Sequence, residues 1–323
     1  MKKVLISLLF SGSLLLPLNT LAASCCGGGS ASSLILPKMA DSMFDYSFSY
    51  EKYDGFWNVD GDHIDDPEGS SFEQYRSNFA YANRLGYRWQ ASIQVPYVWN
   101  KNIYPEKESA TNGLGDTVLG LWYESFDDVK CVWKVTGWKS LEPAIYFGTS
   151  LTLPTGKSMY SGDVTQDNDV TGRGSYRLDA NLLIDKTIYP WSLSWALSYG
   201  MHIERPVNEE FGRTVEPYDL QLGDRISNGI TFGYTHFLES LSTVTVSASV
   251  NDLREGEGKI NGLKDASLPS IKKQSVGLSL SYSTPIMDWV YKVSLNHALQ
   301  GDGRGENFPT TDIVNLGVTY VIR

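Results

Sequence analysis

One stretch constrains the fold of this chain more than any other: apolar and mostly polar side chains alternate strictly in YRWQASIQVPYVW, residues 87–99. The apolar positions include Tyr87, Trp89, Ile93 and Trp99, and arginine, glutamine and serine are among the residues between them. A period of two places successive side chains on opposite faces of a β-strand. The apolar face would point into the core of a soluble sandwich, but it would point toward lipid in a membrane-spanning barrel.

The same alternation recurs along the chain and predicts twelve strands. Most of them exceed the roughly 5–6 residues usual in soluble sheets, and they reach the roughly 9–11 residues that a tilted strand needs to cross a bilayer. After the N-terminal residues, no apolar run approaches the ~18 residues of a transmembrane helix. The expected strands are residues 43–53, 72–84, 87–99, 115–125, 143–153, 174–186, 191–204, 223–237, 242–254, 272–284, 289–300 and 313–322.

The connections between these strands alternate in length, as in outer-membrane barrels with short periplasmic turns and long extracellular loops. The short connections are residues 85–86, 187–190, 238–241 and 285–288. The long polar connections are residues 54–71, 100–114, 154–173, 205–222, 255–271 and 301–312. One connector, residues 126–142, is expected on the periplasmic side but is long. It is either a strand extension or two further short strands, which would raise the count to fourteen.

Together these patterns predict an all-β fold: a transmembrane antiparallel up-and-down β-barrel of about twelve strands over residues 43–323. A soluble β-sandwich does not readily explain so many long strands with such regular loop asymmetry. The final residues, NLGVTYVIR, resemble the signal read by the barrel-assembly machinery, with Ile322 and Arg323 replacing the usual final aromatic residue. We therefore expect the outer membrane of a Gram-negative bacterium, with its lipids and the barrel-assembly machinery as partners.

The N-terminus has the pattern of a secretory signal peptide over residues 1–23, with two lysines before an apolar run and Ala22-Ala23 at its end. Residues 24–42 are expected to form a periplasmic segment or a plug in the lumen. Removing the signal takes away two lysines and no acid, so the net charge of −10 becomes about −12. We expect no nucleic-acid partner, because nucleic-acid binding depends on Lys and Arg contacts to phosphate.

The polar faces of the strands should line the lumen. Barrels of about eight strands are filled by side chains and those of about 16 hold wide channels, so twelve strands suit a narrow passage for a small-molecule solute. Alternatively, the charges pair off and close the lumen, which leaves a structural or surface-interaction role for the acidic loops. The basic residues at positions 76, 84 and 88 would favour anions along their wall. The expected lumen residues are Asp45, Glu51, Arg76, Asn78, Arg84, Arg88, Gln90, Arg177, Asp179 and Arg225.

No residue pattern indicates an enzyme, a metal site or a cofactor. The histidines at positions 202, 236 and 297 lack the neighbouring serine and Asn-Gly pair of an outer-membrane phospholipase. The Gly-Lys-Ser at residues 156–158 lacks the earlier glycine of a phosphate-binding loop. The acidic stretches 60–66 and 163–169 lack the twelve-residue pattern of a calcium loop. We expect no catalytic residues and no cofactor.

Two segments carry a family resemblance: GLGDTVLGLWY at residues 113–123 and LTLPTGK at residues 151–157. With LGDR at residues 222–225, they resemble the outer-membrane transporter family named for the meta-cleavage pathway of phenol degradation. The likeness extends loosely over most of the mature chain. It implies a β-barrel that passes hydrophobic or aromatic compounds, so we expect a channel or facilitator for small solutes.

Three cysteines, Cys25, Cys26 and Cys131, are expected on the periplasmic side, where accessible thiols are oxidised. They leave open a disulfide from Cys25 or Cys26 to Cys131, lipidation of Cys25, and a thiolate metal site. We expect ordinary signal cleavage near Ala23. Mass spectrometry of the non-reduced mature protein tests the pairing, because a disulfide leaves one free thiol and three free thiols exclude it.

Overall fold

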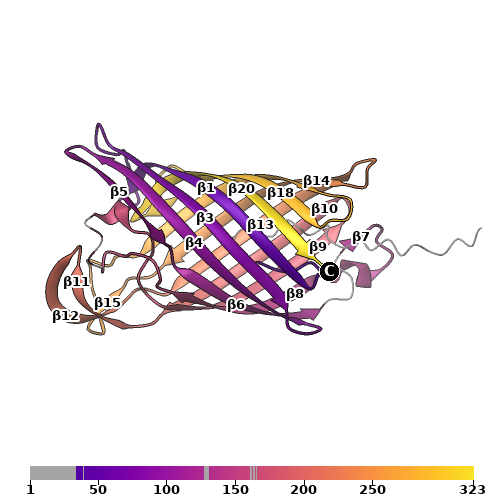
Figure 1. Ribbon diagram of the computed structural model, residues 1–323, viewed down its shortest axis with the longest axis horizontal. Helices are drawn as coiled ribbons and strands as arrows, with labels where there is room; N and C mark the ends of the chain where they lie inside the picture. The colour runs from indigo at the N-terminus through magenta and orange to yellow at the C-terminus, as the bar shows by residue number, and fades with distance from the viewer. Residues whose placement is uncertain (1–33, 39, 127–130, 161, 163, 165) are drawn as a thin grey trace, which may run out of the picture.

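The computed structural model describes residues 34–38, 40–126, 131–160, 162, 164 and 166–323. Within them, twelve long strands form a closed barrel (Figure 1), each antiparallel to the next along the chain, with the last strand pairing with the first. The predicted fold and strand number are confirmed, and every expected strand overlaps an observed one. The barrel strands are β1 Ser42–Trp57, β3 Ser71–Arg84, β4 Trp89–Tyr104, β6 Thr117–Phe126, β8 Ala144–Leu153, β9 Arg177–Ile188, β10 Trp191–His202, β13 Arg225–Phe237, β14 Thr243–Glu255, β17 Ile271–Ser283, β18 Trp289–Ala298 and β20 Phe308–Ile322.

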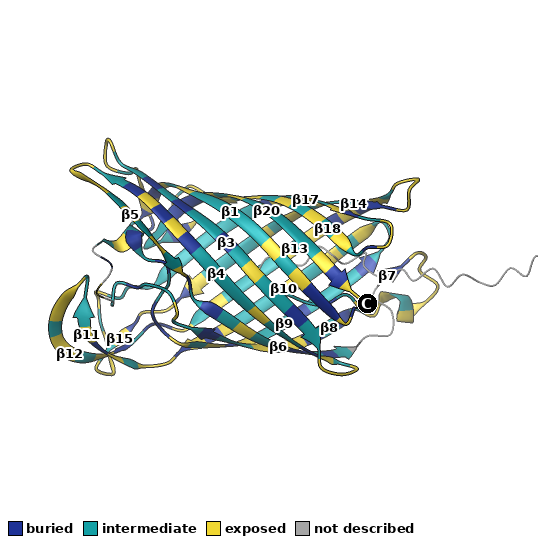
Figure 2. Cartoon of the chain, in the orientation of Figure 1, coloured by how far each residue is buried: buried dark blue, intermediate teal, exposed yellow. Residues whose placement is uncertain are grey.

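The strands expose their apolar face and bury their polar face, which is the reverse of a soluble protein. On β4, Ile93 and Trp99 are 40% and 39% exposed, whereas Gln90 and Asn100 on the other face are buried. Figure 2 shows exposed residues alternating with less exposed ones along the strands. Large apolar side chains on the outer face and polar ones inside are typical of a barrel in lipid. The apolar face of residues 87–99 therefore points outward.

Aromatic side chains gather at the strand ends on the outer face. Near the end that carries the C-terminus, the rings of Trp89 and Tyr123 lie 4.9 Å apart and those of Trp289 and Tyr320 lie 4.6 Å apart. Toward the other end of β4, the rings of Tyr97 and Trp99 lie 4.7 Å apart. Such girdles mark the two membrane–water interfaces, where amphipathic rings are favoured.

The extracellular end carries additional short strands, at the end opposite the C-terminus (Figure 1). β2 His63–Ile64, β5 Lys107–Leu114 and β19 Gly305–Glu306 pair with β1, β4 and β17. A separate four-stranded sheet contains β11 Arg205–Glu210, β12 Arg213–Gln221, β15 Lys259–Ile260 and β16 Leu263–Lys264. No helix among the described residues is long and apolar enough to span a bilayer; the helical turns are η1 Trp138–Leu141 and η2 Asp167–Asp169.

The long periplasmic connector between β6 and β8 supplies a pairing partner for the last residues of β9. β8 begins opposite Asp185, so the last residues of β9 extend beyond it. There the two-residue strand β7, Cys131–Val132, pairs in parallel with Thr187 and Ile188. The connector therefore contributes one short strand in its described part, rather than the two barrel strands that would have raised the count to fourteen.

Arginine at position 93 should destabilise the barrel. Ile93 lies on the outer face of β4 about midway between Trp89 and Trp99, and arginine near the bilayer midplane costs about 2–4 kcal/mol. Gln94 is the matched control, because it faces the lumen and Gln94→Arg should leave stability nearly unchanged. Urea unfolding in liposomes, followed by heat-modifiable migration on gels, measures both. Equal losses of stability in Ile93→Arg and Gln94→Arg would contradict the assignment of these residues to the lipid and lumen faces. Apolar replacements should be tolerated at Ile93 and at the other outward positions Phe48, Tyr81 and Leu197.

Candidate functional site

The inner wall formed by β10, β13, β14, β17 and β18 is built from small residues. The strand registers place them opposite one another on the inward face, and the hydroxyl groups of Ser247 and Ser279 are 2.6 Å apart across β14 and β17. Ordinary side chains just fill a barrel of about eight strands. A twelve-stranded barrel is wider, and most inward side chains of this wall are short, although Lys273 and Lys292 also project inward from it. Its members include Ser192, Ser194, Ser198, Gly200, Ser227, Gly229, Thr231, Gly233, Ser249, Ser275, Gly277, Ser281 and Ser294.

The wall formed by β20, β1, β3 and β4 carries larger polar side chains that hydrogen-bond to one another. The Gln74 amide donates to Asn100 at 2.8 Å and accepts from the Arg76 guanidinium at 2.5 Å. The Asp45 carboxylate accepts from the Thr319 hydroxyl at 2.6 Å. Asn78 and Glu51 face the lumen on the same strands. With Arg84 and Gln90, this wall therefore holds six of the expected lumen residues on the inward face.

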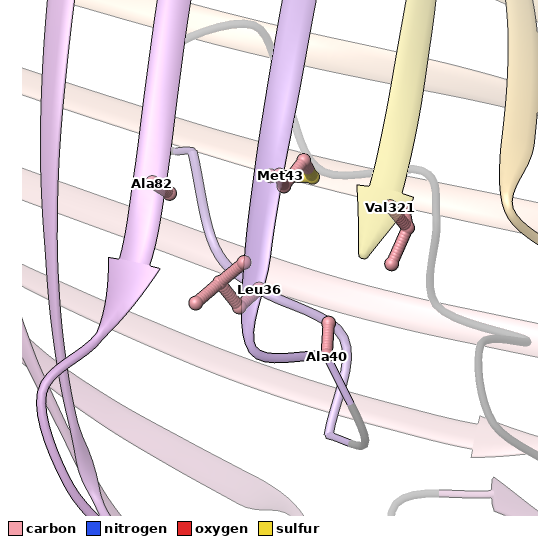
Figure 3. Close-up of a cluster of buried hydrophobic side chains, with 5 residues drawn as sticks. All are labelled: Leu36, Ala40, Met43, Ala82 and Val321. Carbon is pink, nitrogen blue, oxygen red and sulfur yellow. The ribbon is translucent and has the colours of Figure 1, made fainter. Parts of the chain in front are cut away.

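At the periplasmic end, residues 34–41 contact both sides of the lumen. Leu36 is buried against Met43, Ala82 and Val321, which belong to β1, β3 and β20 (Figure 3). Ile35 packs against a second cluster on the facing wall, composed of Trp122, Ala144, Tyr146 and Leu183. The segment before β1 therefore crosses this end of the barrel between two apolar patches.

Hydrogen bonds from the barrel hold this segment in place. The Arg84 guanidinium donates to the carbonyl of Ala40 at 2.9 Å, and to those of Pro37 and Lys38 at 3.1 Å. The Gln90 side-chain oxygen accepts from the Leu36 backbone N–H at 2.7 Å. Both residues face inward at the periplasmic end of the lumen. Their polar groups bind the backbone of residues 34–41.

Arg88 has a different position from the one expected. It lies in the turn before β4, and its guanidinium donates to the Ser125 carbonyl at 3.0 Å. Arg76, Arg84 and Arg88 therefore do not form one anion-attracting wall, because Arg84 binds backbone carbonyls and Arg88 lies outside the strand. Strand parity alone assigned Arg88 to the lumen, since the alternation continues into the turn.

At the extracellular end, the loop between β8 and β9 folds across the mouth of the barrel. Asp169 is 1% exposed and accepts from Asn102 at 2.8 Å and from Ser109 at 2.6 Å, on β4 and β5. Further along the same loop, the Arg173 guanidinium forms an ion pair with Glu255 of β14 at 2.5 Å. The loop is thus fixed to two separated parts of the wall.

The two motif segments meet where this loop begins. The Asp116 carboxylate, which ends Gly-Leu-Gly-Asp, accepts backbone N–H groups from Gly156 at 3.1 Å and from Arg173 at 2.6 Å. A Cβ at Gly172 would lie 2.2 Å from the Asp116 carboxylate, so only glycine fits there. Burial raises the pKa of Asp116 above its usual range, although the two N–H donors and Arg173 act in the opposite direction. The motifs therefore position the extracellular loop, a role that the sequence pattern did not indicate.

The remaining expected lumen residues, Arg177, Asp179 and Arg225, lie together near the extracellular end of β9 and β13. Arg177 forms an ion pair with Asp179 at 2.8 Å. Lys273 on β17 faces the same part of the lumen and donates to Thr311 at 2.6 Å. Sequence reasoning did not single out Lys273, although the inward parity of its strand includes it.

The structure bears only partly on the cysteines. Cys25 and Cys26 lie outside the described residues, and Cys131 is in β7 at the periplasmic end. The described part of the chain contains no group of three or more His, Cys, Asp or Glu residues placed to hold a metal ion. The disulfide, the lipidation and the thiolate site all remain proposals.

Replacing Arg84 should release residues 34–41 from the barrel. Arg84→Gln removes the charge and cannot donate to three carbonyls at once, so amide hydrogen exchange in residues 36–41 should accelerate by about tenfold or more. Lys101→Gln is the control, because Lys101 is an exposed residue of the neighbouring strand far from this segment. Exchange mass spectrometry on the folded barrel measures both variants, and unchanged protection in Arg84→Gln would show that the apolar contacts alone hold the segment.

Comparison with solved structures shows the same fold in proteins of very different sequence. The crystal structure of an outer-membrane channel from Pseudomonas putida F1 matches with a TM-score of 0.64 and 12% identity, covering 91% of this chain and 98% of the channel. The β domain of the Bordetella autotransporter BrkA matches with a TM-score of 0.50 and 11% identity, covering 87% of this chain and 100% of that domain. No family model and no curated protein matches the chain. The chain therefore has the closed β-barrel fold of these outer-membrane proteins, as the sequence predicted.

Proposed function

We propose that this barrel is a channel or facilitator that passes small solutes across the outer membrane. The observation that carries the proposal is the wall of serine, glycine and threonine on five consecutive strands, because side chains of this size leave a polar lumen in a barrel of this width. The fold shared with the channel of Pseudomonas putida F1 is compatible with this function.

Compounds with an aromatic or hydrophobic body are the solutes that we propose. The lumen offers them an apolar surface at its periplasmic end, formed by Trp122, Tyr146 and Leu183 and now covered by Ile35. A polar lumen with one apolar patch suits molecules that have both a polar group and an apolar body. The Gly-Leu-Gly-Asp and Leu-Pro-Thr-Gly segments support the same class, through their resemblance to the transporter family of the meta-cleavage pathway.

We also propose that residues 24–42 act as a plug. Their described part, from residue 34 on, makes apolar contacts with two opposing walls and hydrogen bonds with Arg84 and Gln90. In these contacts the segment supplies backbone groups and apolar side chains, so its release exposes the Arg84 guanidinium and two apolar patches to the lumen. Passage of a solute larger than an ion then requires the segment to move aside.

A closed barrel with a surface-interaction role is the alternative. It would depend on the acidic extracellular loops at residues 54–71 and 154–173. In the second of these, the Asp169 carboxylate is buried and hydrogen-bonded to the barrel, so it anchors the loop and is not available to a partner. The first loop retains exposed carboxylates, and Asp167 of the second loop is also exposed, so these residues are what the alternative can still use.

Conductance in planar bilayers tests the channel and the plug together. The mature protein should conduct ions weakly, and deletion of residues 24–41 should raise the conductance several-fold because two apolar patches are uncovered and one end of the lumen widens. Heat-modifiable migration of both proteins is the folding control. A folded protein with no conductance in either form contradicts the channel, whereas equal conductance in both forms contradicts the plug alone.

A further inference from the structure

Three arginines lie close together at the extracellular end of the lumen, and two of them already have carboxylate partners. Arg173 is paired with Glu255 at 2.5 Å, and the Glu255 side chain is only 4% exposed. Arg177 is paired with Asp179 at 2.8 Å, and the Asp179 side chain is 5% exposed. Both contacts are short and both carboxylates are buried, so each pair is internally neutralised.

The third arginine, Arg225, has no such partner. It faces inward on β13, in register between Gly200 of β10 and Glu255 of β14. Among the described residues, its guanidinium forms no hydrogen bond or ion pair, and Glu255 is bound to Arg173 instead. An arginine cannot lose its proton at ordinary pH, so five N–H donors and one positive charge remain to be satisfied.

The surroundings of Arg225 keep its charge directed toward the lumen. A Cβ at Gly200 would lie 2.2 Å from Asp179 Oδ1 and 2.9 Å from Arg177 Cδ, so the neighbouring ion pair already covers that glycine. The other two arginines repel the Arg225 charge, and Glu255 and Asp179 attract it. These three arginines and two carboxylates together leave one positive charge, carried by a residue that partner side chains do not bind, while the neighbouring Lys273 also interacts with the carboxylates of Glu51 and Asp312.

The wall beyond Arg225 carries small side chains. Ser198 and Ser227 form the next inward pair toward the middle of the barrel, followed by Ala196 and Gly229. The serine hydroxyl groups can donate to an anion, and the small residues after them leave space for an organic body. A charged hydrogen-bond donor beside small side chains can hold the polar end of an elongated solute.

We propose that Arg225 forms a binding subsite for the carboxylate of a small organic monoanion entering the channel. The planar guanidinium matches a carboxylate through two parallel hydrogen bonds. A single unpaired cation matches one negative charge better than the two of phosphate at neutral pH. The inference rests on the proposed channel function and narrows its solutes to those that carry a carboxylate on an apolar body.

Bilayer recordings of the full mature protein test this subsite. In a KCl gradient the wild type should prefer chloride, and added benzoate should block the chloride current. Arg225→Gln should lose most of the chloride preference and need about tenfold more benzoate for the same block, because a charge-assisted bidentate contact is removed. Benzamide, which has the same ring without the charge, should not block the wild type, and inorganic phosphate should block less than benzoate.

Two further variants separate the site from general effects of charge and folding. Arg254→Gln removes an arginine one residue away from Glu255 on the outward face, where the Arg254 side chain is 62% exposed, and should change neither property. Arg225→Lys keeps the charge and should retain the chloride preference while benzoate block weakens. A conducting wild type without chloride preference, or with equal block by benzamide, overturns the subsite and leaves the channel intact. A folded wild type and a folded deletion of residues 24–41 that both fail to conduct overturn the channel and the subsite with it.

Discussion

Backbone hydrogen bonding in lipid is the constraint on which this structure depends. The bilayer core offers no water to an unpaired N–H or C=O group, so a sheet that crosses it must close on itself. Pairing of β20 with β1 over most of their lengths meets that requirement. The same constraint explains the long periplasmic connector, because β8 is too short to pair with the last residues of β9 and β7 supplies the missing partner. The contact between the Trp133 and Tyr189 rings, whose centroids are 4.3 Å apart, then holds the connector at the interface.

Closure also explains why the strands were predictable and their ends were not. A barrel strand has lipid on one side and a polar lumen on the other, so each residue from 89 to 99 must alternate, and that alternation is visible in the sequence. The same parity continued into the turn and wrongly placed Arg88 on the wall, since nothing local marks where lipid contact ends. Arg84, by contrast, faces inward as parity predicts, but its role depends on carbonyl groups at residues 37–40 that sequence spacing cannot bring beside it.

The extracellular loop is a second case in which the sequence alone did not reveal the contacts of a residue. Asp116, Gly156 and Arg173 belong to three separate segments, and the N–H contacts of Gly156 and Arg173 with the Asp116 carboxylate arise only when β6 and β8 are neighbours. A motif such as Gly-Leu-Gly-Asp marks this region in the sequence, because a carboxylate beside glycines favours close approach of backbone N–H groups. It does not reveal which backbone approaches. The backbone groups that bind Asp116 are distant in the sequence, so only the folded chain identifies them.

Residues 34–41 narrow the periplasmic end of the barrel, and the loop between β8 and β9 narrows the extracellular end from other strands. This arrangement sets the route that we propose for a solute. The described contacts of residues 34–41 fall on β20, β1, β3 and β4 and on the facing strands β6, β8 and β9. The extracellular loop is anchored on β4, β5 and β6 and reaches across to Glu255. Between these anchors lies the small-residue wall of β10, β13, β14, β17 and β18, which begins at Arg225 and continues mostly as small residues toward the periplasm, with Lys292 projecting inward from β18. A solute that follows this wall meets the unpaired charge first and the apolar patch last. That order suits a molecule that enters with its carboxylate foremost, because the charge is bound where the lumen is most polar and the apolar body is released where residues 34–41 cover an apolar surface.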